Sequence, residues 1–316
     1  MKILANDGIS PNGVEELEAA GFEVSTTTVA QEQLENYINS ENITVLLVRS
    51  ATKVRKDLID ACPSLKIIGR GGVGMDNIDV DYAREKGLHV INTPAASSES
   101  VAELVFAHLF SGVRFLYDSN RNMPLDGDSK FKALKKAYAK GTELRGKTLG
   151  VIGFGRIGQA TAKIGLGLGM KVVAFDPFME KATVTVPFFD GQSVMFNITI
   201  DSKEDVLKQA DFLTLHVPAQ KEFVIGKSEL ELMKDGAGLI NAARGGVVDE
   251  VAMVEALKSG KLAFAGVDTF ENEPTPAIQV LMTPNVSLTP HIGAATTQAQ
   301  ERIGSELATQ IISILK

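Results

Sequence analysis

The amino-acid sequence predicts an α/β protein whose parallel sheets are covered by helices on both faces. Short apolar, β-branched runs alternate with segments of helical spacing along most of the chain. Glycine is abundant at 29 residues, aromatic residues make up only 6%, and tryptophan is absent, which suits short strands joined to helices by tight turns. A glycine-rich turn, Gly153-Phe-Gly155-Arg-Ile-Gly158, joins one such strand to the helix that follows it.

Length, composition and charge narrow the class further. The 316 residues correspond to about two domains, and a hydrophobic content of 44% predicts buried cores rather than disorder. The net charge of -7 argues against a nucleic-acid or membrane-surface binder, which would be basic. The single cysteine, Cys62, excludes a disulfide framework and a multi-cysteine metal site, and we expect no metal. No apolar run reaches roughly 18 residues and the N-terminus resembles a strand rather than a secretion signal, so we expect a soluble cytoplasmic protein.

The first hundred residues repeat one strand-and-helix theme. Helical spacing predicts a helix from Asn12 to Ala20, and Gly21 ends it. Five short apolar runs predict strands, and they are Ile3–Ala5, Phe22–Val24, Val45–Val48, Leu65–Ile68 and His89–Ile91. Five strands with helices between them indicate a parallel sheet covered on both faces.

The rest of the chain continues in three parts. One long helix is expected from Ser97 to about Asn120, followed by an exposed, lysine-rich arm over residues 121–147. A second strand–helix–strand series runs from Lys147 to about residue 290, and residues 294–316 are helical again. Within this series the long apolar stretch 183–197 is expected to be a local hairpin or an added contact surface.

The glycine-rich turn predicts a dinucleotide site. Gly153 allows the tight turn after the strand, Gly155 lets the backbone approach a pyrophosphate, and Gly158 lets helix and strand pack closely. The start of the following helix offers free N–H groups and a partial positive charge to the phosphates. Asp176 ends the next strand, where a carboxylate binds a ribose diol and repels a 2′-phosphate, so NAD is favoured over NADP.

Three further stretches follow strands of the second series, at the sheet edge where open α/β sheets bind ligands. We expect one strand to end at Arg244. The planar guanidinium of Arg244 can hold a carboxylate and polarise a carbonyl. Asp268 and Glu273 follow the next strand, and His291, one of only four histidines, follows the last. A histidine held by a carboxylate can exchange a proton with a substrate oxygen during reduction of a carbonyl.

Four motifs in this order resemble the D-isomer-specific 2-hydroxyacid dehydrogenase family over nearly the whole chain. They are the run from Gly141 to Phe178, the segments Asn241–Glu250 and Asp268–Pro274, and the segment Pro290–Ala294. The resemblance implies that Arg244 binds the substrate carboxylate and carbonyl, that His291 is the general acid/base, and that Glu273 orients it. The residues it implies for NAD binding are Gly153, Gly155, Arg156, Ile157, Gly158, Asp176, His216, Val217, Pro218, Ala242, Ala243, Asp268 and Val73.

The family resemblance also implies an architecture of two Rossmann-like or flavodoxin-like domains. The substrate domain would combine residues 1–97 with 291–316, and the NAD-binding domain, residues 98–290, would be inserted into it. The helix and arm over residues 98–146 would form the interface of a homodimer, or of a tetramer that contains it.

Within the family, the chain is most similar to the D-3-phosphoglycerate dehydrogenases, in a short form that lacks a C-terminal regulatory domain. Segments 48–53 and 69–79 carry this similarity, which implies oxidation of D-3-phosphoglycerate to 3-phosphohydroxypyruvate, the first step of serine biosynthesis. Arg49 and Arg70 each follow an apolar strand, which aims two cations at an anionic substrate. The residues expected to bind substrate are Arg49, Arg70, Gly72, Val73, Gly74 and, from the arm, Lys136.

Two alternatives stay open at the level of the sequence. Arg70 could instead bind a carboxylate in a glycerate or hydroxypyruvate reductase, or in another D-2-hydroxyacid dehydrogenase, and the arm lysines could simply be a solvated face. A more remote alternative is an NAD-sensing protein of the transcriptional corepressor type, because such proteins share this fold and retain its catalytic residues.

Overall fold

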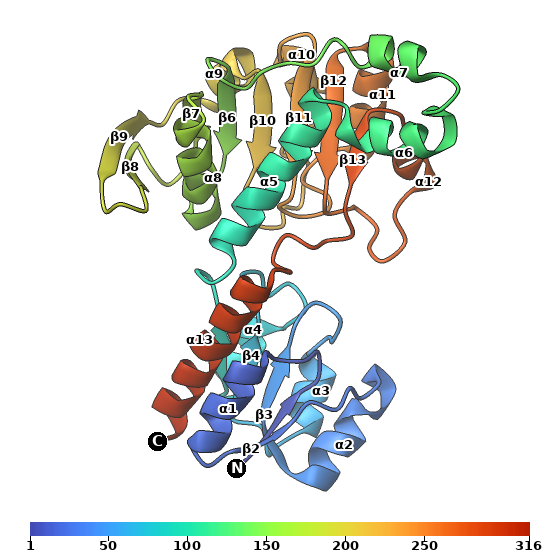
Figure 1. Ribbon diagram of the computed structural model, residues 1–316. Helices are drawn as coiled ribbons and strands as arrows, with labels where there is room; N and C mark the ends of the chain where they lie inside the picture. The colour runs from blue at the N-terminus through green and yellow to red at the C-terminus, as the bar shows by residue number, and fades with distance from the viewer. The chain divides into compact units, whose positions relative to one another are not determined.

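The computed structural model describes all 316 residues, which form two compact units (Figure 1). One unit combines Met1–Ser100 with Ala294–Lys316, and the other comprises Val101–Gly293. Each unit is a parallel sheet with helices on both faces, so the predicted α/β class is confirmed. No helix is long and apolar enough to cross a membrane.

The first unit is built on a five-stranded parallel sheet in the order β2-β1-β3-β4-β5. Its strands are β1 (Lys2–Ala5), β2 (Glu23–Ser25), β3 (Ile43–Val48), β4 (Ile67–Arg70) and β5 (His89–Asn92). Successive residues of β3 point to opposite faces, so that Val45 and Leu47 join one hydrophobic cluster and Leu46 and Val48 the other. Helices α1 (Pro11–Ala19) and α13 (Thr297–Leu315) cover the first face. The second face is covered by α2 (Leu34–Glu41), which follows the short 3-10 helix Gln31–Gln33, and by α3 (Lys56–Ala61) and α4 (Val80–Glu85).

The second unit holds a six-stranded parallel sheet in the order β13-β12-β11-β10-β6-β7. Its strands are β6 (Thr148–Ile152), β7 (Lys171–Phe175), β10 (Phe212–Leu215), β11 (Ala237–Asn241), β12 (Leu262–Val267) and β13 (Val286–Leu288). Helices α5 (Ser98–Val113) and α8 (Arg156–Gly167) cover one face, while α9 (Lys203–Gln209), α10 (Lys227–Leu232), α11 (Glu250–Ser259) and α12 (Ile278–Leu281) belong to the cluster on the other. The strand order reverses between β6 and β10, and a crevice at such a reversal is where α/β sheets bind ligands.

The expected single helix from Ser97 to Asn120 is wrong, because the chain forms two helices there. Helix α5 ends at Val113, Phe115 adopts a left-handed backbone with φ of 55°, and α6 (Leu116–Asp126) starts in a new direction. At the end of α5, a Cβ on Gly112 would lie 2.1 Å from the ring of Phe264, so only glycine lets the helix pack this closely on β12. The arm then forms α7 (Phe131–Ala137), which Figure 1 shows beside α6.

The apolar stretch after β7 is a hairpin, as one of its two interpretations expected. Strands β8 (Lys181–Pro187) and β9 (Ser193–Thr199) pair antiparallel along their whole length. Ile200 then makes a single parallel bridge to Ala174, so the end of the hairpin extends the six-stranded sheet beyond β7.

Candidate active site

The glycine-rich turn after β6 has the geometry that a dinucleotide requires. Gly153 has φ of 89°, and a Cβ there would lie 2.5 Å from the carbonyl oxygen of His216. A Cβ on Gly158 would lie 2.2 Å from the carbonyl oxygen of Gly153, so α8 packs directly against the turn. Gly155 faces open space instead, and no side chain caps the start of α8. The first N–H groups of the 12-residue helix can therefore bind the pyrophosphate of NAD.

Asp176 lies where a ribose diol would bind. One oxygen of its carboxylate accepts a hydrogen bond from the backbone N–H of Phe154 at 2.8 Å, and the other from that of Phe178 at 2.9 Å. These two bonds fix the carboxylate beside the glycine turn and leave each oxygen with capacity for a further donor. The residues present therefore fit NAD.

Two other expected cofactor segments also follow strands of this sheet. His216 follows β10, and its backbone N–H bonds to the carbonyl of Ile152 on β6, which holds the segment 216–218 beside the glycine turn. Burial lowers the pKa of His216 to about 3, so its ring is neutral. Ala242 and Ala243 follow β11 and are buried, so only their backbone can contact a ligand.

Arg244 belongs to a short turn rather than to the strand. The sequence placed the end of the strand at Arg244, but β11 ends at Asn241, whose side chain shapes the next three residues. Its amide oxygen accepts from the N–H of Ala243 at 3.1 Å, and its amide nitrogen donates to the carbonyl of Arg244 at 3.0 Å. The guanidinium folds back to donate to the carbonyl of Ala243 at 2.7 Å. A guanidinium carries five N–H donors in a planar fork, which suits it to bind a carboxylate.

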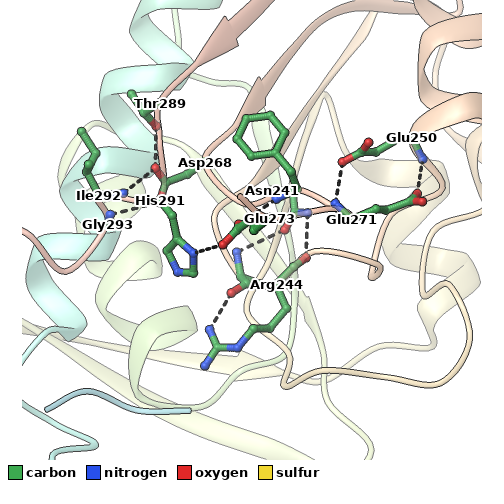
Figure 2. A network of polar contacts seen from close by, with 12 residues as sticks. Asn241, Arg244, Glu250, Asp268, Glu271, Glu273, Thr289, His291, Ile292 and Gly293 are labelled. Carbon is green, nitrogen blue, oxygen red and sulfur yellow. Dashed lines mark hydrogen bonds and ion pairs between the residues drawn. The ribbon is translucent and has the colours of Figure 1, made fainter. Parts of the chain in front are cut away.

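His291 and Glu273 form a hydrogen-bonded pair. Nδ1 of His291 lies 2.8 Å from Oε2 of Glu273, and the other oxygen of Glu273 accepts from the N–H of Phe270 at 3.0 Å. Both side chains are about one-third exposed, at 37% and 36%, so the pair is open to a ligand. Because a carboxylate only accepts, Nδ1 carries the proton, and Nε2 of the neutral ring has the lone pair of a base. Figure 2 shows His291 and Arg244 coming from different loops and lying beside Glu273 in one network.

Asp268 holds the backbone that carries His291. Its carboxylate is 1% exposed and accepts from the hydroxyl of Thr289 at 2.6 Å and from the N–H groups of Ile292 and Gly293 at 2.8 and 2.9 Å. Its carbonyl accepts from the N–H of His291 at 2.8 Å. His291 has φ of 54°, a left-handed conformation that costs a non-glycine residue roughly 1 to 2 kcal/mol. The sequence singled out Asp268 as a cofactor contact, and that stays a prediction; the structure adds that its carboxylate holds this loop.

A second carboxylate pair ties the loop of Glu273 to helix α11. Glu250 accepts the backbone N–H of Glu271, and Glu271 accepts that of Glu250, both at 2.9 Å (Figure 2). Burial raises the pKa of Glu250, and the charge of Glu271 adds to this. Nearby, a Cβ on Gly245 would lie 1.8 Å from the carbonyl oxygen of Phe270, so the Arg244 turn packs directly on the Glu271 loop. Glu250 and Glu271 both lie within the motifs of the sequence, but nothing in those motifs predicted that the two would pair.

The expected substrate residues of the first unit gather at the carboxyl ends of β3 and β4. Arg49 follows β3 and Arg70 ends β4, and both side chains are half-buried. Burial lowers the pKa of Arg49, and the nearby Asp7 opposes this. A Cβ on Gly72 would lie 1.9 Å from a guanidinium nitrogen of Arg70, so only glycine allows the arginine to lie across this loop.

The loop after β4 offers fewer backbone donors than the sequence suggested. The N–H of Gly72 already donates to the carbonyl of Arg70 at 3.0 Å. The N–H groups of Val73 and Gly74 have no partner in the chain, and Asn92 steadies the loop by donating to the carbonyl of Val73 at 2.7 Å. Two adjacent open N–H groups can bind one carboxylate. Lys136 lies apart from this loop in sequence, exposed in the last turn of α7.

The chain is similar in sequence and in structure to several known proteins. Residues 106–293 match the family described as D-isomer specific 2-hydroxyacid dehydrogenase, NAD binding domain. A D-3-phosphoglycerate dehydrogenase of Methanocaldococcus jannaschii is 40% identical over 100% of this chain, which spans 58% of that protein's length. A hydroxypyruvate reductase of Thermotoga maritima is 42% identical over 93% of this chain and 91% of its own. A crystal structure of a Thermus thermophilus protein superposes with a TM-score of 0.85 at 31% identity and covers 100% of this chain and 97% of its own.

Proposed function

The chain belongs to the D-isomer specific 2-hydroxyacid dehydrogenase family, whose NAD-binding domain it carries, and we propose that it oxidises D-3-phosphoglycerate to 3-phosphohydroxypyruvate. The observation that carries the proposal is the hydrogen bond between His291 and Glu273 at 2.8 Å, at the strand ends of the NAD-binding domain. The reaction would supply the 2-oxoacid from which serine is made.

The proton chemistry falls to His291. When bound, NAD supplies the hydride acceptor. As the hydride leaves C2 of the substrate, Nε2 of His291 accepts the proton of the C2 hydroxyl. The ring then carries a positive charge, which the carboxylate of Glu273 stabilises through Nδ1. In the reverse direction the same nitrogen returns the proton to the carbonyl oxygen.

Substrate anchoring falls to arginine side chains and open backbone N–H groups. Arg244 can bind the carboxylate and the C2 oxygen through its planar guanidinium, which lies beside the pair of His291 and Glu273 (Figure 2). In the first unit, Val73 and Gly74 can bind a carboxylate with the two N–H groups that have no partner in the chain. Arg49 and Arg70 would take the phosphate, with Lys136 as a further cation, because charged bidentate pairs are the strongest hydrogen bonds available to it.

A homodimer through the arm fits the exposed side chains of α6 and α7. Leu125 of α6 and Phe131 of α7 are 76% and 57% exposed. Met123 is a further exposed apolar residue of α6. Exposed apolar groups gathered on one segment are typical of an interaction site. Sedimentation should therefore give twice the chain mass, and Leu125→Glu combined with Phe131→Glu should return it to the monomer.

The substrate is tested by the rate of NADH oxidation with 3-phosphohydroxypyruvate and with hydroxypyruvate. We expect kcat/KM to favour the phosphorylated compound by about a hundredfold, or about 2.7 kcal/mol of transition-state binding. The similarity to a hydroxypyruvate reductase at 42% identity favours a second candidate, a reductase of hydroxypyruvate. Equal rates with the two compounds would support that candidate and contradict the phosphoglycerate assignment.

A further inference from the structure

A buried histidine that the proposed mechanism does not use lies next to the loop of His291. His108, on α5, is 2% exposed, and a Cβ on Gly266 of β12 would lie 2.6 Å from its Cβ. The side chain therefore reaches the strand ends only because residue 266 is a glycine. Its two ring nitrogens lie 2.9 Å from the hydroxyls of Ser287 and Thr289, which flank the end of β13.

The hydrogen bonds around His108 decide which nitrogen carries its proton. Thr289 donates its only hydroxyl proton to the carboxylate of Asp268, which cannot donate in return. The hydroxyl of Thr289 can then only accept from His108, so Nε2 carries a hydrogen. Burial lowers the pKa of His108, with the charge of Asp268 opposing, so the ring is neutral and Nδ1 accepts from Ser287.

This chain of donors ends at the backbone of His291. His108 donates to Thr289, Thr289 donates to Asp268, and Asp268 accepts from the N–H groups on the far side of His291. The left-handed conformation of His291 persists only while its surroundings hold it. If the donor at His108 is lost, the hydroxyl of Thr289 is free to turn away from Asp268.

We propose that His108 is a positioning residue, which orients Thr289 and Asp268 by donating from Nε2 and so keeps His291 in its reactive conformation. The proposal rests on the proposed role of His291 as acid/base. His108 itself touches neither the substrate nor the cofactor.

Three full-length variants test this role, measured with NADH and 3-phosphohydroxypyruvate. His108→Leu removes the donor and should lower kcat about tenfold, or about 1.4 kcal/mol, with the KM values and the Kd for NADH little changed. His108→Gln keeps an amide donor near Thr289 and should restore kcat to within about threefold of the parent protein. Ser287→Ala leaves the bond from Nε2 to Thr289 intact and should stay within about twofold.

The outcomes separate positioning from a merely structural role. An unchanged kcat in His108→Leu would overturn the proposal, as would a His108→Gln or Ser287→Ala variant as slow as His108→Leu. If the His108 variants do not fold, the ¹⁵N spectrum of the unaltered protein shows which ring nitrogen of His108 carries the proton. A neutral ring with its proton on Nε2 would support the proposal. A neutral ring with its proton on Nδ1 would overturn it. Failure of the proposed function gives another result, namely that His291→Asn keeps the parent activity.

Discussion

The strand ends of the second unit and the glycine loop of the first differ in how far their side chains are fixed. Around His291, the buried carboxylate of Asp268 and the partly exposed carboxylate of Glu273 accept backbone N–H groups, so the pair of His291 and Glu273 is held from several sides. After β4, the cations Arg49 and Arg70 are half-buried and two N–H groups have no partner in the chain. From this difference we propose that the reaction type depends on the hydrogen-bonded network of the second unit, whereas substrate choice depends on the cations and open N–H groups of the first.

The largest effect should come from the hydrogen-bonded network of the second unit. His291→Asn removes the base and should lower kcat about 10³-fold for every keto acid tested, within the range that general acid/base groups contribute. Binding of NADH, followed by its fluorescence, should not change. Glu273→Gln keeps an acceptor for Nδ1 but removes the charge, so its loss should be smaller, and a larger loss than that of His291→Asn would contradict the assigned roles.

A selective effect should come from the open region. Arg70→Met removes a cation of the first unit and should lower kcat/KM for 3-phosphohydroxypyruvate about thirtyfold, as expected for a charged hydrogen bond of about 2 kcal/mol. The value for hydroxypyruvate should change less than threefold. Lys258→Met, at an exposed cation in the last turn of α11, serves as the matched control. An equal loss with both keto acids in Arg70→Met would place Arg70 at the carboxylate instead.

The cofactor preference should respond to one carboxylate. Asp176→Asn keeps an acceptor for the N–H of Phe154 but removes the charge that repels a 2′-phosphate. We expect the NADH-to-NADPH ratio of kcat/KM to fall about tenfold, or about 1.4 kcal/mol. A ratio that stays the same would remove Asp176 from the ribose site.

The smallest effect should be one of stability. An acid whose pKa is raised on folding favours the folded state below its ordinary pKa, and this contribution is lost as pH rises through the raised value. Glu250→Gln cannot ionise, so the loss of stability at high pH disappears, while its amide oxygen still accepts from the N–H of Glu271. The substitution should therefore raise Tm at pH 7.5 by about 2 to 4 °C. The difference from the parent should shrink as pH falls toward 4.5, the ordinary value. Glu250→Ala lacks the acceptor, and a rise in Tm for it too would contradict this explanation.

Much of the fold could be predicted from local signals, and the failures have physical causes. Apolar β-branched runs located the five strands of the first sheet to within about two residues, because strands buried on both faces must be apolar throughout. The break at Phe115 could not be predicted, because the helical spacing continues through it and no glycine or proline marks the left-handed residue.

The residues of the site also fall into those that the sequence could predict and those that it could not. Arg244, Glu273 and His291 stand in motifs with a readable chemistry, so the sequence alone singled them out. The contact of Asp268 with the loop of His291 and the position of His108 could not be predicted, because a histidine within an apolar helix carries no local mark of its partners. Those partners lie on β13 and the loop after it, far along the chain, and only folding brings them together.

The central claim is that chemistry and substrate choice are carried by separate regions. The most direct test measures kcat/KM for 3-phosphohydroxypyruvate and hydroxypyruvate in the parent protein, in His291→Asn and in Arg70→Met. We predict that the ratio of the two values stays within about threefold of the parent ratio in His291→Asn and collapses by at least tenfold in Arg70→Met. A ratio that collapses in His291→Asn and survives in Arg70→Met would contradict the account.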